Sequence, residues 1–273
     1  SMWCILTIAI CNAVTSVILV PHMEIAGAAL GTSISFMIGS ILAIIIILKS
    51  EPWLIYLKTK RPLLEQIKMW AKDSRYMFVR SVTLMIGWFI APVIAIQIGI
   101  EYLAAFQITL QLWVIAAFFM DGIAITANTL GASLLGANQT EAFAILQRRL
   151  LVMALFVGVC FALLYGFGTR QLASLFTHDI KVVNIIVTAS LILAVQQPIN
   201  SLAFYSDGLI FATKNFAYAA KHIVIGLLIC FIPSLALAYY FNSFILIWFA
   251  PATLNIYRSW SNYKLMFSRK KYA

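Results

Sequence analysis

Apolar residues fill this chain in runs of about twenty, separated by short polar or basic segments. A helix of that length spans the hydrocarbon core of a bilayer, which is about 30 Å thick. Eight runs fit, near residues 2–20, 25–48, 76–98, 102–133, 149–168, 182–206, 216–240 and 243–262. Because lipid leaves backbone polar groups to be satisfied internally, the pattern predicts an all-α polytopic membrane protein of about eight transmembrane helices.

The longest interruption, residues 49–75, divides these spans into two helices followed by six. Aromatic and aliphatic residues alternate with basic ones over 51–73, as in an amphipathic helix lying on the inner leaflet. We expect two transmembrane helices in 1–48, a six-helix lobe in 76–262 and a basic cytoplasmic tail in 263–273. An uneven division, with a first residue that is not methionine, predicts part of a longer two-lobed protein.

Positive charge lies almost entirely in the connections on one side of these spans. Of the nineteen Lys and Arg residues, only Arg170 and Lys181 belong to the other side. Lys and Arg are enriched in cytoplasmic loops, so both chain ends and the 49–75 connection are expected in the cytoplasm. We expect the protein in a bacterial inner membrane.

The composition excludes several classes of protein. Only 10% of residues are charged and 63% are hydrophobic, whereas a soluble domain carries about 25% charged residues. The net charge of +10 lies between apolar spans rather than in one patch, which argues against nucleic acid. No phosphate loop, nucleophile elbow, HExxH or cysteine–histidine ligand spacing occurs, so we expect no enzyme, cofactor or metal site. Without a phosphate loop the chain offers no ATP site, so if it is a transporter an ion gradient would drive it.

Charged residues inside spans are costly and therefore candidates for function. Arg80 lies one turn into the third span, Asp121 lies in the fourth and Asp207 ends the sixth. The third and fourth spans turn near residue 100, so Arg80 and Asp121 lie at nearly the same depth, which predicts an ion pair. The pair is either a static contact that orients two helices or a gate or protonation element.

Side-chain amides share helix faces with these acids at 100° per residue. They are Gln107, Gln111 and Asn128 in the fourth span and Gln196 and Asn200 in the sixth. Amides without hydrogen-bond partners are costly in lipid. The amides of both spans must therefore line a water-filled cavity or form hydrogen bonds between helices. Pro198 is expected to kink the sixth span.

Four stretches resemble one family of exporters. They read GAALGTSIS at 27–35, FMDGIA at 119–124, LGAN at 135–138 and YSDGLI at 205–210. Together they are similar to the multidrug and toxic compound extrusion (MATE) family, and most to its DinF-like subfamily. Asp121-Gly122 and Asp207-Gly208 repeat one dipeptide at matching depth within this resemblance.

The resemblance implies twelve helices in two lobes, of which the eight spans here look like helices five to twelve. It implies export of small organic, often cationic, compounds in exchange for protons or sodium, by alternating access. One position departs from the family pattern, because Ser16 stands four residues after Asn12 where an acid is often found. The position matching this family's first-lobe coupling acid is therefore neutral here.

Two other functions remain open. A flippase for lipid-linked sugars belongs to the same superfamily, but it would need several basic groups in its groove, and only Arg80 and Arg258 lie clearly within spans. A truncated product that transports nothing is the third possibility.

Overall fold

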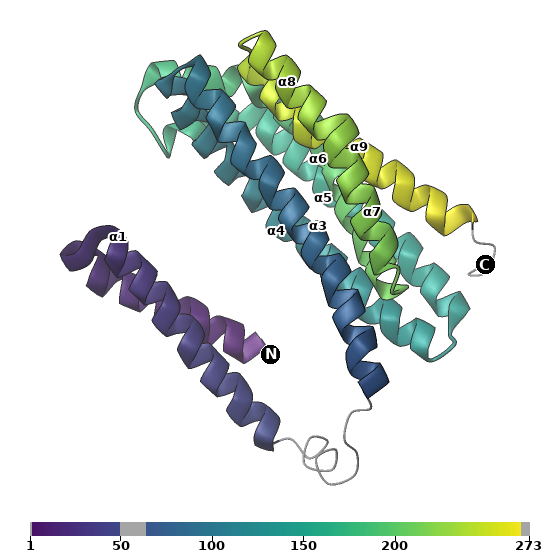
Figure 1. The fold of residues 1–273 in the computed structure, drawn as a ribbon. Coiled ribbons are helices and arrows are strands. Elements are labelled where there is room, and N and C mark those ends of the chain that lie inside the picture. Colours follow the sequence, from purple (N-terminus) through teal and green to yellow (C-terminus); the bar gives the residue numbers. More distant parts are fainter. Residues whose placement is uncertain (1, 50–63, 269–273) are drawn as a thin grey trace. The chain divides into compact units, whose positions relative to one another are not determined.

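The computed structural model describes residues 2–49 and 64–268, and helices account for nearly all of them (Figure 1). Within that range no strand occurs, so the predicted all-α class is confirmed. The elements are α1 (Met2–Lys49), α3 (Leu64–Ile98), α4 (Ile100–Gly136), α5 (Thr140–Ser174), α6 (Ile180–Ala212), α7 (Phe216–Gly226), η1 (Leu227–Phe231), α8 (Ile232–Tyr240) and α9 (Phe244–Ser268). They form two compact units, Ser1–Lys68 and Met69–Ala273.

In the first unit, α1 is a hairpin rather than one straight helix (Figure 1). Glu24 has non-helical backbone angles, φ 48° and ψ −122°, and the chain turns back there. Gly27 permits the two arms to touch, because a Cβ at this position would lie 2.4 Å from the carbonyl oxygen of Leu19. The predicted spans 2–20 and 25–48 are the two arms of this hairpin.

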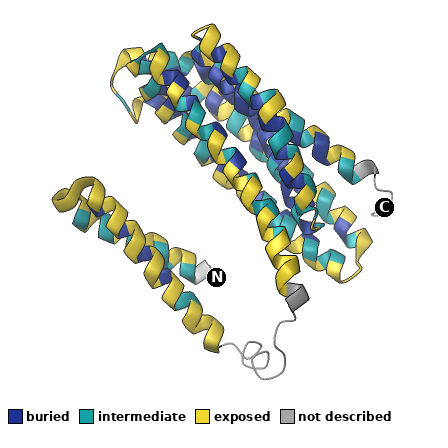
Figure 2. Ribbon diagram, viewed as in Figure 1, coloured by how far each residue is buried: buried dark blue, intermediate teal, exposed yellow. Residues whose placement is uncertain are grey.

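In the second unit, α6 is the central helix and packs directly on α4, α5 and α9. Small residues bring the backbones close: a Cβ added to Gly208 would lie 2.3 Å from the carbonyl oxygen of Ala124. Buried side chains gather along this helix and its neighbours, whereas α1 exposes most of its length (Figure 2). The largest fully buried side chains include Trp248, Tyr165, Phe106 and Phe143.

The predicted span 216–240 is a helix with a widened turn. Between α7 and α8 the segment η1 forms a π-helix, and Pro233 stands at the start of α8. Proline has no N–H to donate, which favours a shift in the hydrogen-bond pattern just before it. The π turn buries Leu227 and Phe231 against the rest of the unit.

The predicted count of eight spans is confirmed only in part. Among the described residues, six stretches are long and apolar enough to cross a membrane. One of them is α1, which holds two predicted spans in its two arms. The predicted span 243–262 is helical within α9, but α9 is not one of the six.

The predicted linker differs from the structure at its carboxy-terminal end. Residues 50–63, which hold most of the expected amphipathic helix, lie outside the described residues. Residues 64–75 form the first turns of α3, because no helix breaker separates them from the following span. At the other end, α9 includes residues 263–268 of the predicted tail.

Candidate functional site

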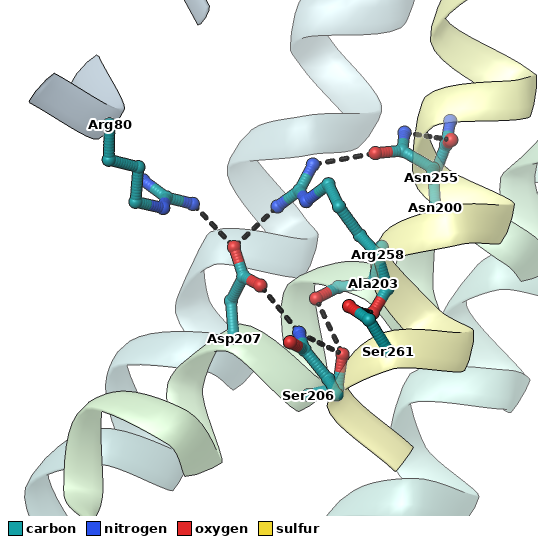
Figure 3. Close-up of polar contacts among 9 residues, drawn as sticks. Arg80, Asn200, Ala203, Ser206, Asp207, Asn255, Arg258 and Ser261 are labelled. Carbon is teal, nitrogen blue, oxygen red and sulfur yellow. Dashed lines mark hydrogen bonds and ion pairs between the residues drawn. The ribbon is translucent and has the colours of Figure 1, made fainter. Parts of the chain in front are cut away.

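Asp207 on α6 binds two arginines that come from two other helices (Figure 3). Arg80 of α3 and Arg258 of α9 each donate from Nη2 to Oδ2 of Asp207, the second at 2.5 Å. Asn262 donates to Oδ1 at 2.8 Å. Asp207 is 7% exposed, so these three donors replace the water that its charge would otherwise need.

A chain of side-chain amides continues from Arg258 along α6 and α9. Nη1 of Arg258 donates to Oδ1 of Asn255 at 2.6 Å, and Asn255 donates to Oδ1 of Asn200 at 2.7 Å. Asn200 in turn donates to Oε1 of Gln197 at 3.3 Å. We call Asn255, Asn200 and Gln197 the amide ladder. All three are at most 2% exposed, so the ladder is a buried structure that fixes the guanidinium of Arg258.

A cavity of about 280 Å³ lies beside this network. Four charged side chains line it: Arg80, Asp121, Asp207 and Arg258. Aromatic rings form much of the rest, and we call them the aromatic wall: Trp88, Trp113, Phe204, Phe211 and Phe231. The rings of Trp88 and Trp113 are 4.8 Å apart between centroids, and the guanidinium of Arg80 lies 5.0 Å from the centroid of Phe211.

The predicted ion pair between Arg80 and Asp121 is not formed. Asp121 lines the cavity and is exposed, and within the described residues its carboxylate makes no hydrogen bond or ion pair. Counting residues from the α3–α4 turn predicted that Arg80 and Asp121 lie at one depth, but it took no account of α6. This helix crosses α4 closely at Gly208, and Asp207 thereby comes within reach of Arg80. Arg80 binds Asp207 instead, and Arg258 binds the same carboxylate.

The five predicted amides lie in different environments, and none lines the 280 Å³ cavity. Gln107 and Gln111 are exposed and Asn128 is half-buried. Asn200 belongs to the amide ladder. Gln196 is 1% exposed, and within the described residues neither its Nε2 nor its Oε1 has a hydrogen-bond partner. A role for these amides in lining a larger cavity between two lobes stays a prediction.

Sequence reasoning missed the contribution of α9. Asn255, Arg258 and Asn262 all point into the network from this helix, and Arg258 had been considered only as a basic residue within a span. Their spacing of three and four residues is itself a signal. It places a polar stripe on one face of an otherwise apolar helix, and such a stripe must face protein.

In the first unit, Ser16 occupies the position at which the family resemblance predicts an acidic residue. Ser16 donates to Oδ1 of Asn12 at 3.1 Å, so the two residues form a neutral hydrogen bond. Among the described residues, the charged side chains that form ion pairs or line the cavity therefore belong to the second unit.

Comparison with known proteins places the chain among transporters. The MatE family model matches residues 77–237, over half of the chain. Protein DETOXIFICATION 42 of Arabidopsis thaliana is 30% identical over 188 residues, covering 69% of this chain and 36% of that protein. The chain thus spans about a third of the length of this relative.

Solved transporters share the fold at low identity. The MATE transporter VcmN of Vibrio cholerae, in its bent form, matches with a TM-score of 0.79 at 17% identity, covering 98% of this chain and 63% of that one. A MOP superfamily transporter of Pyrococcus furiosus matches with a TM-score of 0.84 at 15% identity, covering 99% and 62%.

Proposed function

This chain belongs to the MATE family, whose members are transporters rather than enzymes, and we propose that it serves in secondary active efflux of organic compounds. The proposed substrates are small organic molecules, often cationic, and the proposed exchange ion is a proton or sodium. Two lobes would expose the site alternately to the two sides of the membrane. Kinship with the DinF-like subfamily stays a prediction.

The observation that carries this proposal is the cavity of the second unit. Its lining combines the aromatic wall with Asp121, a carboxylate that has no hydrogen-bond or ion-pair partner among the described residues. Aromatic faces attract cations, and the attraction strengthens where water is excluded. A carboxylate beside such faces is suited to a flat organic cation.

Coupling to an ion gradient would use the same charges. Arg80, Asp121 and Asp207 bring one guanidinium and two carboxylates to one cavity, so a change of charge on either carboxylate alters the balance between them. We propose these three residues as the gate or coupling group. Charged groups at this depth in a membrane are usually kept for such a role.

The arrangement of the arginines argues against a lipid-linked sugar flippase. Such a protein would present basic groups to an anionic phosphate. Both Arg80 and Arg258 instead bind Asp207, and Asp121 lines the same cavity, so two carboxylates balance the charge of the two arginines.

For location, the chain is an integral membrane protein. We further propose that both of its ends lie in the cytoplasm and that it resides in a bacterial inner membrane, on the distribution of Lys and Arg.

The test is dye export by the longest reading frame that contains this sequence, expressed in a bacterial strain lacking its own drug exporters. Cells should accumulate less ethidium, and an ionophore that collapses the ion gradient should abolish the difference. Residues 1–273 alone should export none, because an interlobe cavity needs both lobes. Failure of the well-expressed longer frame to lower ethidium accumulation would contradict the proposal, and translocation of a lipid-linked sugar would support the flippase.

A further inference from the structure

The two arginines on Asp207 are held very differently. Arg258 is 7% exposed and donates through both Nη atoms, one to Asp207 and one to the amide ladder. Both guanidinium groups also lie over a ring, Arg258 at 5.5 Å from the centroid of Phe204 and Arg80 at 5.0 Å from that of Phe211, so the ring contacts do not distinguish them. Moving Arg258 would leave both the carboxylate and the amide oxygen of Asn255 without their donor, so Arg258 is fixed.

Arg80 has a single hydrogen-bond partner within the described residues, Oδ2 of Asp207. Its side chain is 15% exposed and lines the cavity. It comes from α3, whose backbone lies farther from its neighbours than the backbone of α6 lies from α4, α5 and α9. If Arg80 left, Asp207 would keep Arg258 and Asn262 as donors.

Asp121 is the other carboxylate that lines the same cavity as Arg80. The positive charges of Arg258 and Arg80 both act on it. It has no ion-pair partner among the described residues, whereas Asp207 binds both arginines. Two carboxylates thus share one fixed arginine and one that can move.

Resting on the proposed efflux function, we infer that Asp121 is the carboxylate that binds the transported organic cation, and that Arg80 is its tethered competitor. With the cation on Asp121, Arg80 stays on Asp207. When the cation leaves, Arg80 moves to Asp121, and each carboxylate then has one arginine. The cation and the guanidinium therefore exclude each other from Asp121.

The competition can be measured as ethidium binding to the longest reading frame, purified in nanodiscs, by fluorescence anisotropy. Asp121→Asn should weaken binding by about tenfold or more, because it removes the carboxylate. Arg80→Gln should tighten binding by roughly threefold or more, because it removes the competitor. In the Asp121→Asn background, Arg80→Gln should change nothing, since no site remains to compete for.

That last comparison separates competition from simple charge repulsion, which would let Arg80→Gln tighten binding in either background. Glu101→Gln, on the same helix but outside the cavity, is the matched control and should bind as the unaltered protein does. A single cooperative melting transition should show that each variant is folded.

Weaker binding by Arg80→Gln, or unaltered binding by Asp121→Asn, would overturn the inference while export by the unaltered protein upholds the proposed function. If the unaltered protein neither binds nor exports ethidium, the proposed function fails and this inference with it.

Discussion

Arg80 and Arg258 donate to the same oxygen of Asp207, although one lies midway along α3 and the other in α9 (Figure 3). Two guanidinium groups repel each other at this distance unless a negative charge lies between them. The carboxylate of Asp207 therefore holds three helices of the second unit together, and its removal should be felt by all of them.

Replacing Asp207 with Asn should destabilise the protein by about 3–5 kcal/mol, because two largely buried arginines lose their counter-charge. The melting temperature in detergent would measure the loss. Combining this change with Arg80→Gln should cost less than the sum of the two single changes, since the second removes one of the stranded charges. An additive result would show that Arg80 and Asp207 do not interact.

Asp121→Asn should change stability by less than about 1 kcal/mol, because Asp121 has no hydrogen-bond or ion-pair partner among the described residues. The same melting assay compares it directly with Asp207→Asn. Equal losses in the two variants would mean that Asp121 also compensates an arginine, contrary to the geometry.

The sequence predicted that Arg80 and Asp121 lie close together, and both line one cavity, but it did not predict the partner of either. Depth follows from the number of residues to a turn, and the α3–α4 hairpin placed Arg80 and Asp121 at one level. The partner depends on how a third helix packs against that hairpin, which no count along the chain contains. Here Gly208 lets α6 approach the backbone of α4 at Ala124, and Asp207 thereby reaches Arg80.

The transmembrane helices likewise could be predicted from the local sequence, whereas the details of their turns could not. Apolar runs sufficed to predict the helices, since lipid leaves few alternatives for the backbone. The reversal at Glu24 was expected as a loop between two spans and occurs as a single non-helical residue. The π turn in η1 was not predicted, because Pro233 marks a disturbance but does not specify its form.

The amide ladder should contribute to stability by fixing Arg258. Asn255→Ala removes the acceptor of Arg258 and the donor to Asn200, both of which are buried. Leaving these groups unsatisfied should cost about 1–3 kcal/mol in thermal unfolding. Asn128→Ala, a half-buried amide outside the ladder, is the control and should cost less. A wild-type melting temperature for Asn255→Ala would show that water replaces the ladder.

Replacing the glycine of each Asp-Gly dipeptide with alanine should change the stability of the protein in opposite directions. A Cβ at Gly208 would lie 2.3 Å from the carbonyl oxygen of Ala124, so Gly208→Ala must separate α4 from α6 and should cost about 1–3 kcal/mol or more. Gly122 has nothing within 4 Å of its Cβ position, so Gly122→Ala should be neutral or stabilise by up to about 1 kcal/mol. Equal melting temperatures for the two variants would contradict the close crossing.

The predicted orientation in the membrane can be tested on the two ends of α5. This helix has 35 residues and is therefore roughly 50 Å long, more than the hydrocarbon core requires, so its flanking turns should lie on opposite sides of the membrane. Asn138 lies in the turn before it and Thr177 in the connection after it. Arg148 and Arg149 stand near the first of these turns, which the charge distribution assigns to the cytoplasm.

Single cysteines at the two positions should therefore label differently in intact cells. The background needs the native free cysteines, Cys4, Cys11, Cys160 and Cys230, replaced by serine or alanine. A membrane-impermeant maleimide should label Thr177→Cys from outside and should label Asn138→Cys only after the membrane is permeabilised. The reverse pattern would invert the topology. It would then place the basic connections outside, against the charge asymmetry from which the orientation was inferred.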